Sequence, residues 1–263
     1  MNTLERIVAA KRKEVPVRME ESPVRSLERM PGFTRNTIPL TLALLNPERT
    51  GIIAEFKRKS PSKGVLNNYA TIEEVTTGYF RAGASALSIL TDAEFFGGSS
   101  EDLIRARNIN PIPILRKDFI IDEYQVLESK AMGADAILLI AALMDKHRIK
   151  QLAALARSLH LQVILEVHDA AELALANEHV SVIGVNNRDL RDFSVDINRS
   201  IELAPLIALD FLKISESGIH SVLAVKQLRS VGFDGFLIGE HFMKEVDPAT
   251  AFSEFVKQII QNP

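Results

Sequence analysis

The feature that most constrains this fold is a series of eight short apolar runs, which recur roughly every 26 residues after residue 50. Between most of the runs lie segments with apolar residues three or four apart, the spacing of an amphipathic helix. Alternating strands and helices predict a parallel sheet with right-handed crossovers. The runs are GIIAEF (51–56), SALSIL (85–90), PIPILR (111–116), DAILLI (135–140), LQVILEV (161–167), VSVIGV (180–185), DFLKIS (210–215) and GFLIGE (235–240).

Eight such units favour a closed (β/α)8 TIM barrel, a fold that typically needs ~250 residues. The alternative is a doubly wound open sheet, which more often has five or six strands, and no Gly-x-Gly-x-x-Gly turn follows the first run. Ahead of the runs lie a charged amphipathic helix, 2–15, and a proline-punctuated stretch, 16–47. We therefore predict one domain over 1–263, in which an N-terminal helical extension (1–50) packs on a barrel (51–263).

Composition excludes several classes of function. The formal net charge of −3 argues against a general nucleic-acid or membrane-surface binder. The chain has no cysteine, and its six histidines form no His-x-His or His-Glu-x-x-His pair, so we expect no disulfide and no metal site. Residues 1–15 are too charged for a secretory signal, and no apolar run reaches membrane-spanning length. We expect a cytoplasmic protein, monomeric and without an obligate protein partner.

Polar residues follow the apolar runs where the strands end, which is where barrels of this kind carry their active sites. Glu55 and Lys57 stand two apart and so share one face of the first strand. Charges are rarely buried unless paired, and here opposite signs converge on one rim. The pattern predicts a pocket that holds both acids and bases. Its strand-end residues are Glu55, Lys57, Lys117, Glu166, Asn186, Arg188, Glu216, Ser217, Gly218, Gly239 and Glu240.

Two stretches in this set favour phosphate binding. SESGI (215–219) supplies small residues and backbone amides before a predicted helix, 219–229. IGEHFM (238–243) places a glycine at the end of the eighth strand, where a short extra helix would begin. The loops after strands seven and eight are the usual phosphate site of these barrels, and helix N-termini favour anions.

The motifs together resemble the indole-3-glycerol-phosphate synthase family of tryptophan biosynthesis. The resemblance spans almost the whole chain, in the order of the family's own motifs. Its most specific parts are EFKRKSPS (55–62), RKDF (116–119) and NNRDL (186–190). Further matches are LERIVAAKRKEV, ILTDAEFFGGS, ILEVHD, ESGI and FLIGEHFM.

The resemblance implies ring closure, decarboxylation and dehydration of 1-(2-carboxyphenylamino)-1-deoxyribulose 5-phosphate, without a metal or an organic cofactor. Lys117 is our choice for the acid that protonates the substrate carbonyl during ring closure. Glu166 and Lys57 are candidates for the acid and base of dehydration, in an order that the sequence leaves open. The resemblance places Glu55, Asn186, Arg188, Glu216 and Ser217 in the active site, and Lys57, Gly218, Gly239 and Glu240 at the phosphate. Phe96, Phe119 and Leu139 are candidates for the apolar slot of the aromatic ring.

Three other functions fit parts of the pattern. Phosphoribosylanthranilate isomerase shares the fold, but its chemistry usually uses a cysteine, which this chain lacks. A Schiff-base aldolase would use Lys117 as a nucleophile. A non-catalytic phosphate-ligand binder would need cations and amides but not the glutamates.

Overall fold

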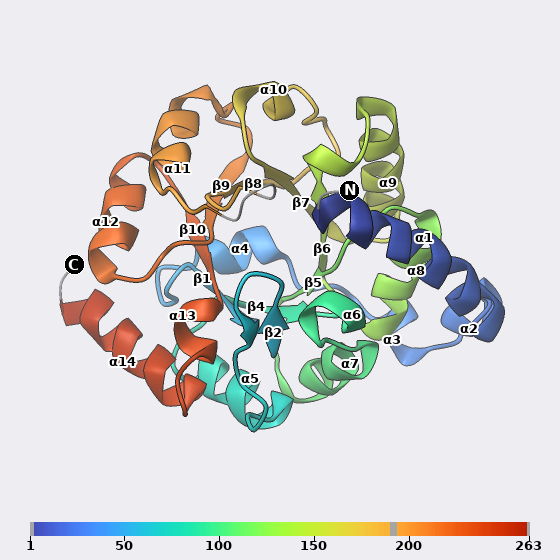
Figure 1. The fold of residues 1–263 in the computed structure, drawn as a ribbon, viewed down its shortest axis with the longest axis horizontal. Coiled ribbons are helices and arrows are strands. Elements are labelled where there is room, and N and C mark those ends of the chain that lie inside the picture. Colours follow the sequence, from blue (N-terminus) through green and yellow to red (C-terminus); the bar gives the residue numbers. More distant parts are fainter. Residues whose placement is uncertain (1–2, 190–193, 262–263) are drawn as a thin grey trace.

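The computed structural model describes residues 3–189 and 194–261, and its centre is a closed barrel of eight parallel strands (Figure 1). The strand order is β1-β10-β9-β8-β7-β6-β5-β4, so each barrel strand pairs with its sequence neighbours and β1 closes the ring against β10. The barrel strands are β1 (Ile52–Phe56), β4 (Ala86–Leu90), β5 (Ile114–Lys117), β6 (Ala136–Ile140), β7 (Gln162–Val167), β8 (Val182–Asn186), β9 (Leu212–Glu216) and β10 (Gly235–Ile238). Each overlaps one predicted apolar run, so the predicted (β/α)8 barrel is confirmed and the open sheet is excluded.

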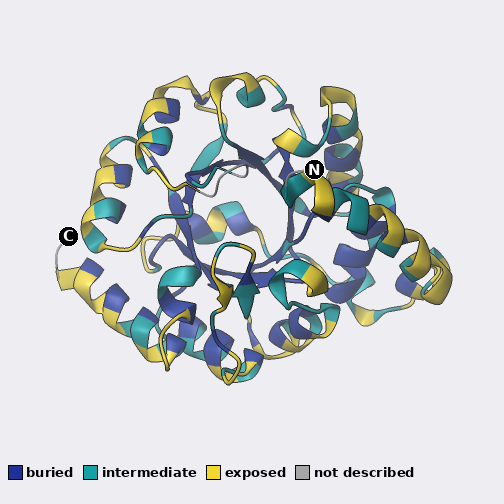
Figure 2. Ribbon diagram, viewed as in Figure 1, coloured by how far each residue is buried: buried dark blue, intermediate teal, exposed yellow. Residues whose placement is uncertain are grey.

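Helices surround the barrel, and Figure 2 shows their buried faces turned toward the strands and their exposed faces outward. Several begin at a side chain that accepts a hydrogen bond from the first turn, as Thr71, Ser99 and Ser221 do. They are α5 (Ile72–Arg81), α6 (Ala93–Phe96), α7 (Ser100–Ile109), α8 (Glu123–Met132), α9 (Lys146–Ser158), α10 (Ala170–Leu173), α11 (Asn198–Leu203), α12 (Val222–Ser230), α13 (Glu240–Met243) and α14 (Pro248–Gln261), with 3-10 turns η1 (Ala141–Leu143) and η2 (Ala204–Leu206).

The strands divide the apolar core into two layers because successive side chains point to opposite faces. Ile52 and Ala54 of β1 belong to the larger layer between the strands and the helices. Ile53 belongs to the smaller layer inside the barrel. This inner layer fills the lower part of the barrel and leaves the carboxyl ends of the strands for polar groups.

Residues before β1 contribute to both ends of the barrel. They form α1 (Thr3–Glu21), α2 (Val24–Leu27), α3 (Pro31–Thr34) and α4 (Leu40–Leu44). Leu40 and Leu44 of α4 join the inner layer, and a Cβ added at Gly235 would lie 2.9 Å from Leu44 Cδ2. Helix α4 therefore closes the amino-terminal end of the barrel, while a hairpin of β2 (Lys59–Ser60) and β3 (Gly64–Val65) follows β1 at the other end.

Helix α1 is longer than the predicted helix 2–15 and continues through Pro16. Tertiary contacts explain the difference, because Val15 is buried with Tyr124 of α8. The Tyr124 hydroxyl lies 2.9 Å from the carbonyl of Arg18 and 2.8 Å from that of Ser22. Its hydrogen can be donated to either carbonyl at the end of α1, and the Ser22 N–H also donates to the Arg18 carbonyl at 2.8 Å.

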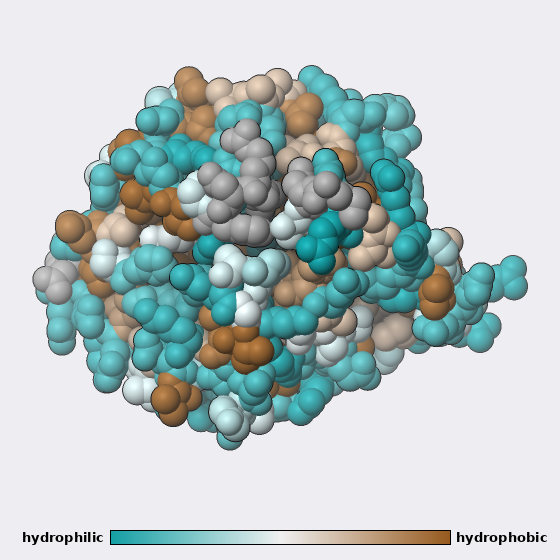
Figure 3. Space-filling model, viewed as in Figure 1, coloured by the Kyte–Doolittle hydropathy of each residue, from teal (hydrophilic) through white to brown (hydrophobic). Residues whose placement is uncertain are grey.

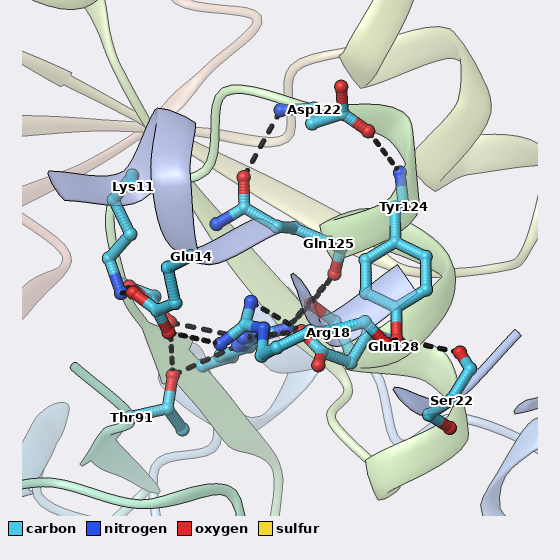
Figure 4. Close-up of polar contacts among 12 residues, drawn as sticks. Lys11, Glu14, Arg18, Ser22, Thr91, Asp122, Tyr124, Gln125 and Glu128 are labelled. Carbon is cyan, nitrogen blue, oxygen red and sulfur yellow. Dashed lines mark hydrogen bonds and ion pairs between the residues drawn. The ribbon is translucent and has the colours of Figure 1, made fainter. Parts of the chain in front are cut away.

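A buried ion network joins α1 to the barrel (Figure 4). Lys11 Nζ is fully buried and lies 3.0 Å from both Asp92 Oδ2 and Asp118 Oδ1, and 2.9 Å from Glu14 Oε2. The fully buried Arg116 pairs with Asp118 at 3.0 Å and extends the network into β5. Burial lowers the pKa of Lys11, but Asp118, Asp92 and Glu14 outweigh burial and raise it above the ordinary value. The lysine therefore stays charged and ties α1 to the loops after β4 and β5.

The surface facing the viewer in Figure 3 is mostly hydrophilic, with hydrophobic residues scattered across it. Within residues 3–189 and 194–261, no helix has the length and apolarity needed to cross a membrane. The same residues contain no group of three or more His, Cys, Asp or Glu side chains arranged to hold a metal ion.

Candidate active site

A pocket opens at the carboxyl ends of the strands, as the strand-end pattern predicts. It brings together every predicted site residue except Leu139. Lys117, Asn186 and Glu216 are the last residues of their strands, and Glu55 and Glu166 stand one residue before the ends of theirs. The barrel itself therefore sets the spacing of these polar groups. The predicted residues that line it are Glu55, Lys57, Phe96, Lys117, Phe119, Glu166, Asn186, Arg188, Glu216, Ser217, Gly218, Gly239 and Glu240.

Lys117 lies at the centre of the polar groups. Its Nζ donates a hydrogen bond of 3.1 Å to Glu166 Oε2 and lies 3.9 Å from Glu216 Oε2. Asn186 Nδ2 donates to the other oxygen of Glu166, Oε1, at 3.0 Å. Glu166 and Glu216 are each 1% exposed, so these carboxylates interact through a medium that contains little water.

The pKa values of the two carboxyl groups are shifted in opposite directions. Burial raises the pKa of Glu166, but Lys117, His168 and the Asn186 hydrogen bond lower it below the ordinary value. Burial and the neighbouring charges of Glu166 and Glu55 raise the pKa of Glu216 to about 8, against the lowering effect of Lys117. Near neutral pH the site therefore holds one ionised and one protonated carboxyl group, an arrangement suited to acid–base chemistry.

Lys117 keeps its charge in this setting. Burial lowers its pKa, but the negative charges of Glu166, Glu216 and Glu55 outweigh burial and raise the pKa well above the ordinary value. Its ammonium group remains protonated throughout the neutral range and can donate a proton when a strong enough base forms beside it.

Glu55 and Lys57 do share a face, and they pair directly. Lys57 Nζ donates to Glu55 Oε1 at 2.7 Å. Ser88, the neighbour of Glu55 in the β1–β4 register, lies with its Oγ 3.2 Å from Glu55 Oε2. Glu55 is thus held on two sides, and its charge compensates that of Lys57 where the pocket opens.

Two glycines, one in β8 and one directly after β10, make space for Glu216 and Glu55. A Cβ added at Gly184 of β8 would lie 2.3 Å from Glu216 Oε1. A Cβ added at Gly239 would lie 2.5 Å from Glu55 Oε1. Gly239, predicted only for the phosphate, therefore also sets the position of a carboxylate.

The predicted phosphate corner is formed by the ends of β9 and β10. Ser217 and Gly218 both have positive φ, +66° and +75°, so the chain turns tightly after β9. Asn187 Nδ2 fixes this turn by donating to the Ser217 carbonyl at 3.0 Å. Helix α13 begins directly after Gly239, and the first amides of a helix have no partner within it.

Arg188 crosses this corner toward Glu240. Its Nη2 lies 2.9 Å from Glu240 Oε2, and its Nη1 donates to Ser62 Oγ at 3.2 Å. The Glu240 carboxylate is thus engaged by an arginine, which leaves its backbone amide as the group that suits an anion. The same contacts join the loops after β1, β8 and β10.

The prediction for Leu139 is wrong. Leu139 is fully buried in the layer between the strands and the helices and points away from the pocket. In the β6–β7 register Ile140 stands beside Glu166, which faces inward, so alternation turns Leu138 and Ile140 into the pocket. These two join Phe96 and Phe119, whose rings lie 5.9 Å apart, in an apolar wall. The sequence shows the alternation, but only the register with β7 decides which set of residues faces the pocket.

Sequence reasoning also missed residues that no strand-end pattern marks. Leu4 and Ile7 of α1 line the pocket. The sequence places this helix on the barrel but does not indicate which of its residues reach the pocket. His220 and His241 lie at the phosphate corner, with ring centroids 5.9 Å apart. The sequence could have indicated both histidines, because they follow the predicted phosphate-binding stretches SESGI and IGE.

Comparison with known sequences relates the chain to one family. The family model described as "Indole-3-glycerol phosphate synthase" matches residues 4–255. A protein of that name from Bacteroides thetaiotaomicron is 46% identical over 259 residues, covering 97% of this chain and 98% of the relative. Another from Albidiferax ferrireducens is 41% identical over 255 residues, covering 95% of this chain and 97% of the relative.

Solved structures with low sequence identity share the fold. Tryptophan synthase subunit alpha from Legionella pneumophila aligns with a TM-score of 0.61 at 12% identity, over 84% of this chain and 97% of that one. The 3-hexulose-6-phosphate synthase of Salmonella typhimurium aligns with a TM-score of 0.62 at 16% identity, over 81% of this chain and 99% of that one. At these identities the likeness concerns the barrel alone.

Proposed function

The chain belongs to the indole-3-glycerol phosphate synthase family, ring-closing carboxy-lyases of tryptophan biosynthesis that act on a phosphorylated small molecule, and from that premise we propose how its pocket performs the reaction. The substrate, 1-(2-carboxyphenylamino)-1-deoxyribulose 5-phosphate, carries a carboxylate, an aromatic ring and a phosphate. The pocket offers cations, an apolar wall and an amide-rich corner to match them. The observation that carries the proposal is the contact of Lys117 with two glutamates whose pKa values are shifted apart.

Substrate binding uses the two ends of the pocket. The phosphate lies against the backbone amides of Gly218, Gly239 and Glu240 and beside Lys57. The aromatic ring lies against the apolar wall that includes Phe96 and Phe119, and Arg188 with Lys57 attracts the anionic groups. Ser217 supports the turn that presents Gly218.

Ring closure is driven by Lys117. The aromatic carbon that bears the carboxylate attacks the ribulose carbonyl carbon, and Lys117 protonates the carbonyl oxygen as the C–C bond forms. Loss of carbon dioxide then returns the electrons of the broken C–C bond to the ring system. Glu166 holds Lys117 in place by accepting its hydrogen bond, and Asn186 fixes Glu166 by donating to the other carboxylate oxygen.

Dehydration needs an acid for the departing hydroxyl and a base for a ring-system proton. Glu166 and Lys57 are the candidates for these two roles, and Glu166, whose lowered pKa keeps it ionised, is better suited to be the base. Glu55 accepts a hydrogen bond of 2.7 Å from Lys57 and so holds the lysine side chain in the pocket. Glu216, protonated near neutral pH, lies 3.9 Å from Lys117 and can restore its proton.

The proposal covers 1–263 as one domain, with 1–50 an extension packed on the barrel 51–263. It places the protein in the cytoplasm as a monomer that needs no metal or organic cofactor for turnover. Buried contacts between α1 and the barrel support this domain assignment.

The test is turnover of the synthetic substrate by the purified protein, followed by the fluorescence of the indole product. Addition of a chelator should leave the rate unchanged. Borohydride treatment with substrate should leave Lys117 unmodified, whereas a covalent adduct there would favour the Schiff-base mechanism. Absence of product with intact folding and substrate binding would instead favour a phosphate-ligand binder.

A further inference from the structure

His168 lies beside a proposed catalytic carboxylate, although the mechanism above does not use it. It follows β7 two residues after Glu166, so both side chains leave the strand on the same face. Its Nε2 lies 3.6 Å from Glu166 Oε1, and its Nδ1 lies 3.2 Å from Glu172 Oε2. The side chain is 13% exposed, so the ring lies between two carboxylates and largely out of water.

Glu172 holds the imidazole in this orientation. Its Oε2 also accepts a 2.7 Å hydrogen bond from the backbone N–H of His168. Its own backbone N–H donates to Asp169 Oδ1 at 3.0 Å, where α10 begins. The carboxylate is thus fixed by the backbone of His168 at the start of α10, and Nδ1–H donates to it.

The other ring nitrogen is aimed at the active site. Nε2 is buried and makes no hydrogen bond within the described chain. The charged groups that face the ring are Glu166 from β7, Glu172 from α10 and Arg199 from α11. Burial lowers the pKa of His168, but the Glu172 hydrogen bond and the two carboxylates outweigh burial and Arg199, so the pKa is raised.

We propose that His168 is a positioning residue for Glu166: an imidazolium, fixed by Glu172, that holds Oε1 of Glu166 and keeps the carboxylate ionised while Oε2 serves Lys117. This inference rests on the proposed role of Glu166 in the reaction. It differs from a purely structural role, in which His168 would only join β7 to α10 through Glu172. A structural role makes no demand on Nε2, whereas the positioning role requires a charged Nε2–H directed at Glu166.

A pair of substitutions separates the two ring nitrogens. His168→Asn keeps a donor near the position of Nδ1 and removes the group that faces Glu166. His168→Gln keeps a neutral donor near the position of Nε2. His179→Asn is the matched control, because His179 precedes β8 at the opposite end of the barrel and is half-buried.

In His168→Asn the acid limb of kcat should move up by about one pH unit, since Glu166 loses a neighbouring positive charge. At a pH below both acid limbs kcat should fall about tenfold, while KM stays within about twofold because the phosphate and carboxylate contacts remain. His168→Gln should fall between this variant and the wild type, and His179→Asn should match the wild type. A His168→Asn profile that superimposes on the wild type would overturn the proposal.

A second measurement does not depend on turnover. Nuclear magnetic resonance titration of the six imidazoles, with His168→Asn used for assignment, should show His168 titrating above the ordinary value of about 6.5. Glu172→Gln should lower that titration, because it removes one of the two facing carboxylates. A His168 signal that titrates at or below about 6.5 overturns the inference even in an active enzyme. Absence of turnover with the expected titration counts against the proposed function instead.

Discussion

Replacing Glu216 with glutamine should stabilise the protein more as the pH rises. The native carboxyl group keeps its proton up to a pKa of about 8, whereas the unfolded chain releases it near 4.5. Between these values the native state binds more protons than the unfolded state, so the wild type loses stability with increasing pH. Each pH unit contributes about 1.4 kcal/mol, which over this interval sums to at most about 5 kcal/mol. A neutral amide does not titrate, so the free energy of unfolding of Glu216→Gln should not contain this pH-dependent decrease.

The assay is urea unfolding of both proteins at pH 5 and at pH 8.5. The difference in the free energy of unfolding should grow by between about 2 and 5 kcal/mol in favour of Glu216→Gln. Glu202→Gln, a substitution at an exposed position of α11, is the control and should show no such growth. A difference that is the same at both pH values would refute the reasoning, because it would mean that the Glu216 carboxyl is already ionised in the native protein at pH 5.

Three further predictions concern Lys117 as the proposed acid, the buried Lys11 and the proposed anion corner. Lys117→Ala should lower kcat at least about a hundredfold with little change in substrate affinity, and Lys117→Arg should rescue poorly, because a guanidinium is a poor proton donor. Near-normal turnover of Lys117→Ala would move the acid to Lys57. Lys11→Met should cost about 3–5 kcal/mol in urea unfolding at pH 7, because buried carboxylates lose their cation, and a loss below about 1 kcal/mol would contradict this. Sulfate soaked into crystals should bind the amides of Gly218 and Gly239, and an anion bound only elsewhere would refute the assignment.

The strands and their polar ends could be predicted because both depend on local pattern. An apolar run of four to six residues between helical segments specifies a barrel strand, and the residue that follows it must reach the rim. Glu166 and Glu216 were therefore found from position alone. Their opposite pKa shifts could not be predicted, since these depend on burial and on distances between residues far apart in sequence.

The errors arose where tertiary contacts outweigh local pattern. Leu139 is as apolar as Leu138, and only the register with β7 decides which of them faces the pocket. Pro16 is a sound reason to end a helix, but the contacts of Tyr124 with the end of α1 outweigh it. Lys11 reads as a surface residue of a charged helix, and nothing local reveals that two aspartates from other loops meet it.

Gly184 illustrates how a residue without a functional group can limit what a catalytic site tolerates. The Glu216 carboxylate occupies the space that a side chain at position 184 would need. An alanine at this position would compete with the carboxylate for the same space and turn it away from Lys117. Mutant libraries that vary only the acids and bases of this pocket would therefore keep the space at position 184 unchanged. An engineer who wants a different acid at position 216 should vary position 184 along with it, treating the two strands as a single design unit.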